Sequence, residues 1–327
     1  MLFNPLAGSF ASKLDGRLSS ALPPDGHCLK SREADWRKSE ILRMSSGTET
    51  SEITIRNIDD VAQMRAVEDL QKEVWGVPDL DVVPLTQLVA AREAGGILIG
   101  AFDGPTLVGF VYGFPALEHK QLTHHSHMLA VKPAYRKFDL GRRLKLTQRE
   151  QAMAQGVTLM TWTFDPLQSL NAYLNFAKLG VVSNRYLPDF YGEDPSSFLH
   201  QTGTDRLLVS WFIKSDRVQQ LASGVVSEID SIPGTPLVKV DTDESPRRTA
   251  LSAALVDDHA SIEIPADINS LHQRHPELAL RWRADTRWAF TEAIKAGYVV
   301  TGFVRESCGK QQLGKYLLRK GTLNQFN

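Results

Sequence analysis

The spacing of apolar and polar residues along the chain alternates between the period of a strand and that of a helix. Glu52–Arg56 alternates residue by residue, which predicts a short strand. Asp59 then caps a segment whose apolar residues, from Val61 to Val74, recur at helical spacing. Pro84 opens a second expected helix, which runs to Ala94 and is ended by two glycines.

Beyond these helices, short apolar runs bounded by turn residues predict a series of strands, and Asp103-Gly104 between two of them predicts a hairpin. The expected strands are Ile97–Phe102, Thr106–Phe114, Gln121–Val131, Val157–Phe164, Val181–Tyr186 and Arg206–Ile213. Two more helices are expected at Leu140–Gln155 and Leu167–Leu179, each ended by a glycine. The order is strand, two helices, three antiparallel strands, helix, strand, helix and two strands.

Composition narrows the class of protein. The chain has 327 residues with a net charge of −1, so no overall field attracts nucleic acid or an anionic membrane. No apolar run approaches the ~20 residues of a membrane span. The two cysteines, Cys28 and Cys308, are far apart in the sequence, which favours a reducing compartment over a disulfide framework. We therefore expect a soluble cytoplasmic protein that binds neither nucleic acid nor membranes, and leave its oligomeric state open.

The most informative motif follows the strand that ends in Val131-Lys132-Pro133. A short loop with Arg136 and Lys137 leads through Asp139 and Gly141 into a helix that begins with two further arginines. A strand that feeds a helix through such a loop forms a pyrophosphate site, because loop N–H groups and the positive end of the helix dipole face the anion. The arginines add charge and can bind phosphate in a bidentate way.

This stretch resembles the GNAT acetyltransferase superfamily, whose pattern is a strand ending in Val-x-Pro followed by Arg/Gln-x-x-Gly-x-Gly/Ala. Val131-Lys-Pro133 matches, Arg136 matches the first motif position and Gly141 the last. Asp139 stands where the family usually has its first glycine, so its carboxylate must turn away from the diphosphate or repel it. The alternative interpretation is an ordinary strand, turn and helix with a solvated basic face.

The order of elements is also that of the GNAT superfamily, over about residues 53–214. The resemblance implies an α/β fold with a mixed, mostly antiparallel sheet flanked by helices, extended by a C-terminal α/β part. A later stretch, Ser169–Val181, is similar to the family's Asn-x-x-Ala-x-x-x-Tyr-x-x-x-Gly-Phe, with Ala172 and Gly180 in register. Ser169 replaces the asparagine. Phe176 replaces the tyrosine whose hydroxyl often protonates the leaving thiolate.

Three parts of the chain are expected. Residues 1–50 have no sustained period and predict a disordered segment, with Met44 as a plausible start. Residues 51–215 are expected to form the GNAT acyltransferase domain, and 216–327 a small C-terminal α/β subdomain. In that last part the pattern predicts strands at Leu237–Val240, Ser261–Pro265, Tyr298–Val304 and Tyr316–Arg319, and a long helix at Asn269–Ala296 interrupted near His275-Pro276.

The resemblance implies an acyl-CoA-dependent acyltransferase that moves acetyl from acetyl-CoA, or another acyl-CoA cosubstrate, to a small-molecule or peptide amine by direct attack. The alternative is a non-catalytic acyl-CoA binding or sensing protein, favoured by the departures at Asp139 and Phe176. By the same resemblance the cofactor-binding residues are Leu129, Ala130, Val131, Arg136, Lys137, Phe138, Asp139, Leu140, Gly141, Arg142, Arg143, Asn171 and Phe176.

An attacking amine must lose a proton, and the leaving thiolate must be stabilised. The candidate bases lie on or beside the two strands that would hold coenzyme A. They are His127, Glu118 and Asp165, with His124 or His125 as further candidates. A hydrogen-bonded strand histidine and a helix-capping aspartate are the structural alternatives. Tyr173 is the candidate acid because it lies three residues before Phe176, with Tyr186 and Tyr191 as alternatives that more often serve in packing.

Three further features of the sequence have a functional and a structural interpretation. His119, His124, His125 and His127 fall within nine residues, but only His125 and His127 share a strand face, so we expect no metal. The polar loop 188–205 is expected to shape the acceptor pocket. Arg281, Arg283 and Arg287 form either a solvated helix face beside Glu277, Asp285 and Glu292 or a site for a carboxylate-bearing acceptor.

Overall fold

The computed structural model describes residues 52–327, except 119, 193–201, 226–234, 309–310 and 327. The expected disordered segment 1–50, His119 and the middle of the loop 188–205 therefore lie outside the described residues. Within the described ranges, no helix is long and apolar enough to cross a membrane.

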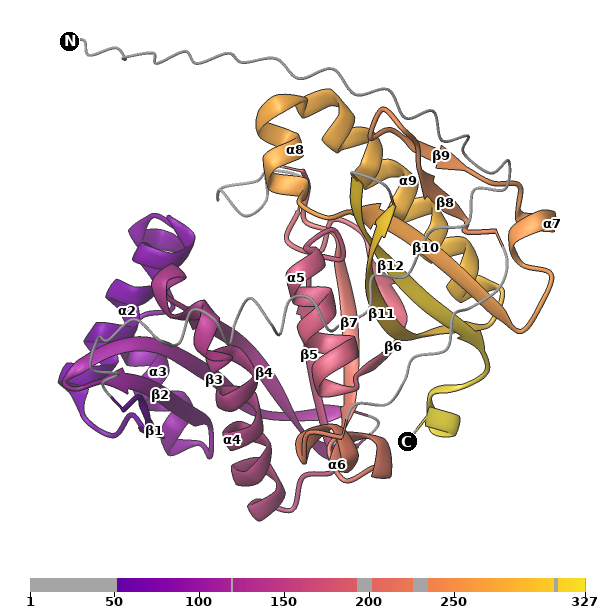
Figure 1. The fold of residues 1–327 in the computed structure, drawn as a ribbon. Helices are drawn as coiled ribbons and strands as arrows, with labels where there is room; N and C mark the ends of the chain where they lie inside the picture. The colour runs from indigo at the N-terminus through magenta and orange to yellow at the C-terminus, as the bar shows by residue number, and fades with distance from the viewer. Residues whose placement is uncertain (1–51, 119, 193–201, 226–234, 309–310, 327) are drawn as a thin grey trace, which may run out of the picture.

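A single ten-stranded sheet runs through the described part of the chain (Figure 1). All neighbouring strands in it are antiparallel except β4 and β5. In spatial order they are β1 (Thr54–Asn57), β2 (Ile97–Asp103), β3 (Thr106–Glu118), β4 (Gln121–Val131), β5 (Leu159–Phe164), β7 (Arg206–Phe212), β6 (Val182–Leu187), β11 (Tyr298–Cys308), β12 (Gln311–Lys320) and β10 (His259–Pro265). The expected mixed, mostly antiparallel sheet is confirmed.

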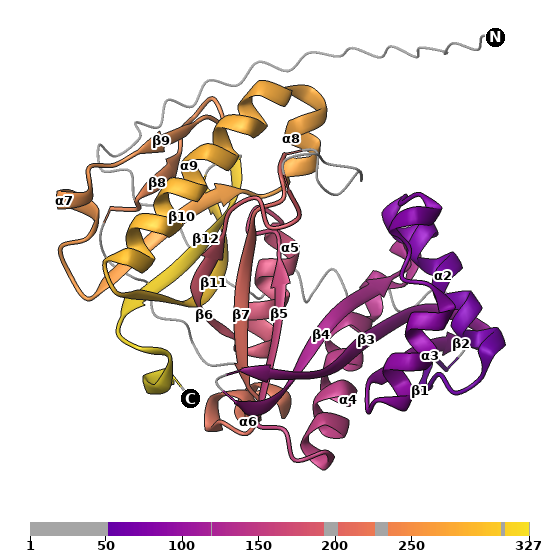
Figure 2. The same ribbon diagram turned by 180° about the vertical axis from the view of Figure 1, so that it is seen from behind.

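Helices cover both faces of this sheet. The α-helices among the described residues are α2 (Val61–Trp75), α3 (Leu85–Glu93), α4 (Leu140–Ala154), α5 (Ser169–Ala172), α6 (Asp216–Ala222), α7 (Leu251–Ala254), α8 (Ile268–Arg274) and α9 (Pro276–Lys295). Figure 1 shows α4 and α5 in front of the sheet, and Figure 2, from behind, shows α2, α3 and α9 on the other side. A small ribbon of β8 (Val238–Val240) and β9 (Pro246–Arg248) lies beside α9.

The first helix shows how local sequence sets these elements. The Asp60 carboxylate accepts a hydrogen bond from the Gln63 N–H at 2.7 Å and caps α2, so the expectation that Asp59 is the cap is wrong by one residue. Gly76 ends the helix in the left-handed conformation. The residues spaced for one helix face, among them Met64 and Val67, are buried against the sheet.

The expected helix 167–179 is not a single α-helix. The chain forms only one α-helical turn, α5, and continues as a π-helix over Tyr173–Leu179 before Gly180 ends it at φ 75°. A wider i→i+5 helix cannot be read from apolar spacing, because one such turn shifts the pattern by about one residue. The expected interruption near His275-Pro276 is confirmed, since Pro276 is the first residue of α9.

The C-terminal strands continue the main sheet. β11 pairs with β6 through Val300 and Ser183, and one apolar core extends from β2 to β12. The Tyr316 ring makes edge contacts with Phe176 at 5.7 Å and Phe290 at 5.0 Å between ring centroids. Residues 216–327 are therefore packed into the same core as the strands before them, and their status as a separate subdomain stays a prediction.

Candidate functional site

The candidate site begins where β4 and β5 part. These two parallel strands are paired only through His124 with Met160 and His125 with Thr161, although both continue beyond these residues. The register of β4 against β3 also shifts between Met128 and His125, which places a bulge at Ser126 and His127. From the bulge to Val131, the edge of β4 that faces β5 is therefore not paired with it. We call the point of divergence, after His125 and Thr161, the apex of the splay.

The chain leaves β4 through a 3₁₀ turn, Pro133–Phe138, and enters α4 at Leu140. Asp139 precedes the helix in the left-handed conformation, at φ 54°, and its side chain does not cap the helix. The first N–H groups of α4 are thus left without an intrahelical acceptor and carry the positive end of the helix dipole. This is the geometry expected for a diphosphate site.

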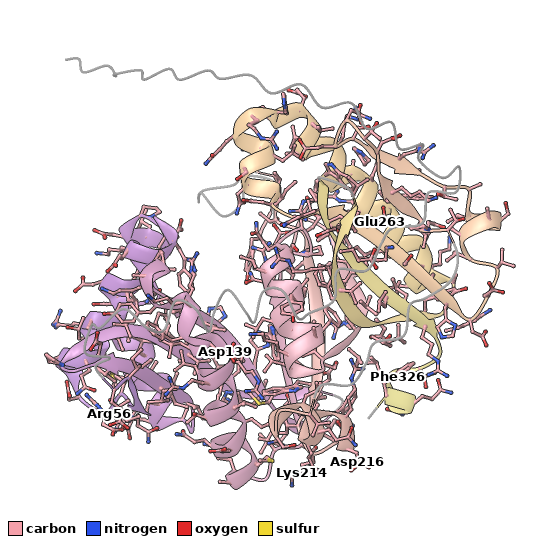
Figure 3. The ribbon with its side chains drawn as sticks, viewed as in Figure 1. Arg56, Asp139, Lys214, Asp216, Glu263 and Phe326 are labelled. Carbon is pink, nitrogen blue, oxygen red and sulfur yellow. The ribbon has the colours of Figure 1, made fainter. Side chains whose placement is uncertain are left out.

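Asp139 turns its carboxylate toward the π-helix. Its Oδ1 lies 2.7 Å from the Lys178 ammonium, and both side chains are partly exposed. Figure 3 labels Asp139 at the start of α4, across from α5. The left-handed backbone explains why glycine suits this position, and aspartate is among the few other residues that tolerate it.

The basic residues of the loop are partly engaged in the fold. Arg142 donates to the Leu221 and Ala222 carbonyls at the end of α6, at 2.7 and 3.0 Å. Arg143 donates to the Ile53 carbonyl, and Arg136 to the Val131 carbonyl at 3.3 Å. Lys137 lies over the exposed Phe138 ring. Arg136 and Lys137 are thus the loop cations nearest the strand end that remain at the surface.

Gly141 faces the space between β4 and the π-helix. A Cβ built on it would lie 3.4 Å from Leu174 Cδ2 and 3.8 Å from Leu129 Cδ2, so a methyl group fits there with little adjustment. A large side chain does not. Leu129, Val131 and Leu174 are half-buried around this space.

On the face of the sheet that carries α2 and α3, two histidines of β4 lie together. The His127 ring is 6.2 Å from that of His125 and 5.7 Å from that of Phe114, between centroids. His127 is exposed as a residue, yet these rings remove part of its hydration and lower the pKa of its imidazole. His125, whose Nδ1 lies 3.2 Å from Thr161 Oγ1, has a pKa lowered to about 4 by burial and neighbouring charge. Both rings are neutral at pH 7.

On the opposite face, under the apex of the splay, lies a buried polar chain that the sequence interpretation missed. Lys145 of α4 is fully buried, and its Nζ donates to Ser126 Oγ at 2.7 Å. Ser126 donates to Gln148 Oε1 at 2.7 Å, and the Gln148 amide meets His124 Nε2 at 3.2 Å. The Lys145 ammonium also lies 3.5 Å from the centre of the Trp162 ring. Burial lowers the pKa of the Lys145 amine well below its usual range.

This polar chain has a signal in the sequence. The buried residues of α4 are Leu140, Leu144, Lys145, Gln148 and Ala152, which is one helical stripe. A lysine and a glutamine within the apolar stripe indicate buried polar residues, which the loop motif does not indicate. Gly113 of β3 completes the arrangement, because a Cβ there would lie 2.4 Å from His124 Nε2.

Comparison with known proteins identifies a family for one segment of the chain. Residues 62–180 match the acetyltransferase (GNAT) family. This part of the chain is therefore a GNAT acetyltransferase domain. No curated protein matches the chain.

Solved structures of such enzymes cover about half of the chain and nearly all of their own length. An aminoglycoside 6'-acetyltransferase type Ii is 21% identical, over 50% of this chain and 98% of its own, with a TM-score of 0.40. The ribosomal-protein-S18-alanine N-acetyltransferase from Escherichia coli is 13% identical, over 50% and 96%, with a TM-score of 0.41. Arabidopsis thaliana Naa50 in complex with a bisubstrate analogue is 16% identical, over 48% and 97%, with a TM-score of 0.39.

The remaining candidates are distributed around the GNAT domain. Glu118, at the end of β3, lies 3.3 Å from the Arg185 guanidinium. Tyr173 is half-buried at the start of the π-helix, and Asn171 is exposed on α5. Phe176 is fully buried in the core, where its ring packs against Phe164 and Tyr316. The roles assigned to these residues stay predictions.

Asp165, at the end of β5, joins the GNAT domain to the C-terminal part. Its two oxygens each accept a hydrogen bond from Arg283 of α9 at 2.8 Å, and one also accepts from the Leu167 N–H. Both side chains of the pair are at most 7% exposed. The capping interpretation is partly wrong, because Asp165 closes a turn before α5 rather than capping it. Its ion pair with Arg283 gives it a structural function.

Two arginines of α9, Arg283 and Arg287, meet acidic residues from the part of the chain before residue 216 rather than solvent. One turn after Arg283, Arg287 contacts Asp205 and Asp189, at 2.5 and 2.6 Å. Tyr186 donates to the same Asp205 at 2.5 Å. The expected solvated face is therefore wrong for Arg283 and Arg287, while Arg281 is exposed. These acids relieve the repulsion of two arginines at i,i+4 spacing.

Among the residues that the structure describes, no three His, Cys, Asp or Glu side chains are grouped to hold a metal ion. A hollow of about 420 Å³ lies near β8 and α8, lined by Asp267 and Arg274 among others, and contains none of the expected site residues. The candidate site is thus defined by the splay of β4 and β5 and by the start of α4.

Proposed function

We propose that this protein is an acyl-CoA-dependent acyltransferase that moves acetyl from acetyl-CoA to an amine of a small molecule or peptide. The observation that carries the proposal is the continuity of two features, the uncapped N-terminus of α4 and the unpaired edge of β4. The first would hold the diphosphate of coenzyme A. An extended arm that starts there and follows β4 backward would bring the thioester toward the apex of the splay.

In this arrangement the chemistry is divided between the two faces of the sheet. A neutral His127, on the face of α2 and α3, would take the proton of the attacking amine, because an amine of pKa ~10.4 is mostly protonated at pH 7. Backbone N–H groups of β4 between Leu129 and Val131 would stabilise the oxyanion, as they do in the family. Glu118 remains an alternative base, and Asp165 a weaker one because its carboxylate is held by Arg283.

A second candidate function is that of an acyl-CoA binding or sensing protein without turnover. Two observations favour it: Asp139 places a carboxylate beside the expected diphosphate position, and Phe176 provides no hydroxyl for the leaving thiolate. The two functions differ in whether the thioester bond is broken.

Release of free thiol from acetyl-CoA, followed with a thiol reagent over a panel of amines and N-terminal peptides, tests the proposal. We expect thiol release that requires both the protein and an acceptor. Tight binding of acetyl-CoA with no thiol release across the panel would favour the sensor. A protein that does not bind acetyl-CoA at all would contradict both functions.

A further inference from the structure

Lys145 is the buried charged group that the proposed reaction does not yet use. Lysine is almost never fully buried unless it is paired, because removing an ammonium from water is costly. Within the described residues, no carboxylate forms an ion pair with Lys145. Its contacts are a hydroxyl, Ser126, and the face of an aromatic ring, Trp162. A leucine would fill the same stripe of α4 at no such cost, so stability does not explain this residue.

The position of Lys145 coincides with the apex of the splay. Ser126 is the residue of β4 directly after His125, the last one paired with β5. Trp162 is the residue of β5 directly after Thr161, the last one paired with β4. The Lys145 ammonium lies between these two side chains, 2.7 Å from the Ser126 hydroxyl and 3.5 Å from the centre of the Trp162 ring. It therefore lies under the point where the strands diverge.

Further contacts connect this position to the π-helix. The Trp162 indole N–H donates to Asn175 Oδ1 at 3.3 Å, and Asn175 is the residue before Phe176. The π-helix thus holds Trp162, and through it the position of the Lys145 ammonium. π-Helical turns inside helices occur frequently at functional sites. Among the described residues, Lys145 is the charged group that contacts the side chains on both sides of the apex.

We propose that Lys145 is a positioning residue that supplies the proton of the leaving thiolate through the Ser126 hydroxyl. This inference rests on the proposed function. The amine nitrogen forms a bond to the thioester carbon, the C–S bond breaks, and its electron pair stays on sulfur. The Ser126 O–H, which donates to Gln148 Oε1 in this structure, turns to that sulfur and passes its proton to it, and Ser126 receives a proton from the Lys145 ammonium. The neutral amine of Lys145 then regains a proton from water after the thiol has left.

The groups that face Lys145 are consistent with this step. His124 and His125 of β4 are the ionisable groups near it, and the charge of Lys145 contributes to the lowering of their pKa values to about 4. They therefore stay neutral and do not compete for its proton at pH 7. An ammonium whose pKa is lowered by burial is a better proton donor near neutral pH than an exposed lysine. The acid on this face and His127 on the other would approach the thioester from opposite sides.

The thiol of bound coenzyme A gives a test that needs no acceptor. The ultraviolet absorbance of its thiolate is titrated against pH in the complex with the wild-type protein, Lys145→Met, Ser126→Ala and, as a control, Lys295→Met at the exposed end of α9. A nearby ammonium favours the thiolate, and so does a hydroxyl that donates to it, so we expect the thiol pKa to rise by about one unit in Lys145→Met, which removes the charge, and in Ser126→Ala, which removes the donor. It should not change in Lys295→Met.

The outcomes separate this inference from the proposed function. Coenzyme A that binds to all four proteins with the same thiol pKa would overturn the role of Lys145 and leave the acyltransferase intact. A wild-type protein that does not bind coenzyme A would overturn both. If Lys145→Met does not fold, Ser126→Ala alone decides, because it keeps the lysine and removes only the hydroxyl between it and the sulfur.

Discussion

At the scale of single residues, His127 and Asp139 make the sharpest predictions. His127 lies in the bulge of β4, next to the apex of the splay, and its imidazole is already neutral at pH 7. Asp139 is the one clear departure from the motif in the phosphate loop, and the structure shows its carboxylate held by Lys178. Each of these residues can be changed without opening the core.

Replacing His127 with alanine should lower the rate of acetyl transfer by ~10²-fold or more, with little change in acetyl-CoA affinity. Because its pKa lies below the ordinary 6.5, the wild-type rate should hold as the pH falls to that value and decline only below it. Steady-state kinetics between pH 5 and 9 measure both effects. Equal rates in the variant and the wild type would remove His127 from the mechanism and leave Glu118 as the base.

Replacing Asp139 with glycine should tighten coenzyme A binding or leave it unchanged. The substitution removes a carboxylate from beside the diphosphate, worth on the order of 1 kcal/mol at an exposed site, and glycine adopts the left-handed backbone freely. Asp139→Asn, which keeps the size and removes the charge, is the control for calorimetry. Strongly weaker binding of both variants would mean that the Asp139–Lys178 pair orders the loop for the ligand.

At the scale of elements, ion pairs between α9 and the preceding part of the chain determine how the C-terminal part is attached. The Asp165–Arg283 pair is buried, and Arg287 repeats the connection one turn later with Asp205. Such pairs do not by themselves make a protein more stable than apolar contacts would, but an unpaired buried charge is costly. The attachment therefore depends on both partners being present.

Replacing Arg283 with methionine should lower the free energy of unfolding by about 3–5 kcal/mol, because it leaves the Asp165 carboxylate buried and unpaired. Urea denaturation measures the change. Arg281→Met, on the exposed side of the same helix, is the matched control and should change stability little. The double variant with Asp165→Asn should lose less than Arg283→Met alone. If Arg283→Met and Arg281→Met are equally stable, the pair does not hold α9 to the sheet.

Much of the fold could be predicted from local sequence, because the strands and helices up to residue 214 follow their apolar periods. The loop between β4 and α4 was predicted as well, since the motif is contiguous, while its binding of a diphosphate stays a prediction. Contacts between distant segments could not be predicted: Asp165 and Arg283 are 118 residues apart, and neither residue by itself indicates the other. The burial of Lys145 could have been predicted from the sequence, because this residue lies on the apolar stripe of α4. A lysine that follows two arginines in a helix is, however, also typical of a solvated face.

At the scale of the whole molecule, one sheet carries both the GNAT domain and the C-terminal strands. The splay of β4 and β5 divides the sheet, with helices α4 and α5 on one face and α2 and α3 on the face of His127 (Figures 1 and 2). β11, β12 and β10 extend the sheet beyond β6, and α9 closes over their core. In the proposed function, the cofactor lies on one face of the sheet and the base for the acceptor amine on the other.

Calorimetric titration of coenzyme A into the wild-type protein, Gly141→Ala and Gly141→Trp tests the central claim most directly. A Cβ at Gly141 meets only ordinary contacts with Leu174 and Leu129, whereas an indole would fill the space between β4 and the π-helix at the start of α4. We predict binding to the wild type and to Gly141→Ala, and none to Gly141→Trp, at an unchanged melting temperature. Equal affinity of the folded Gly141→Trp variant, or no binding by the wild type, would contradict a coenzyme A site at this loop.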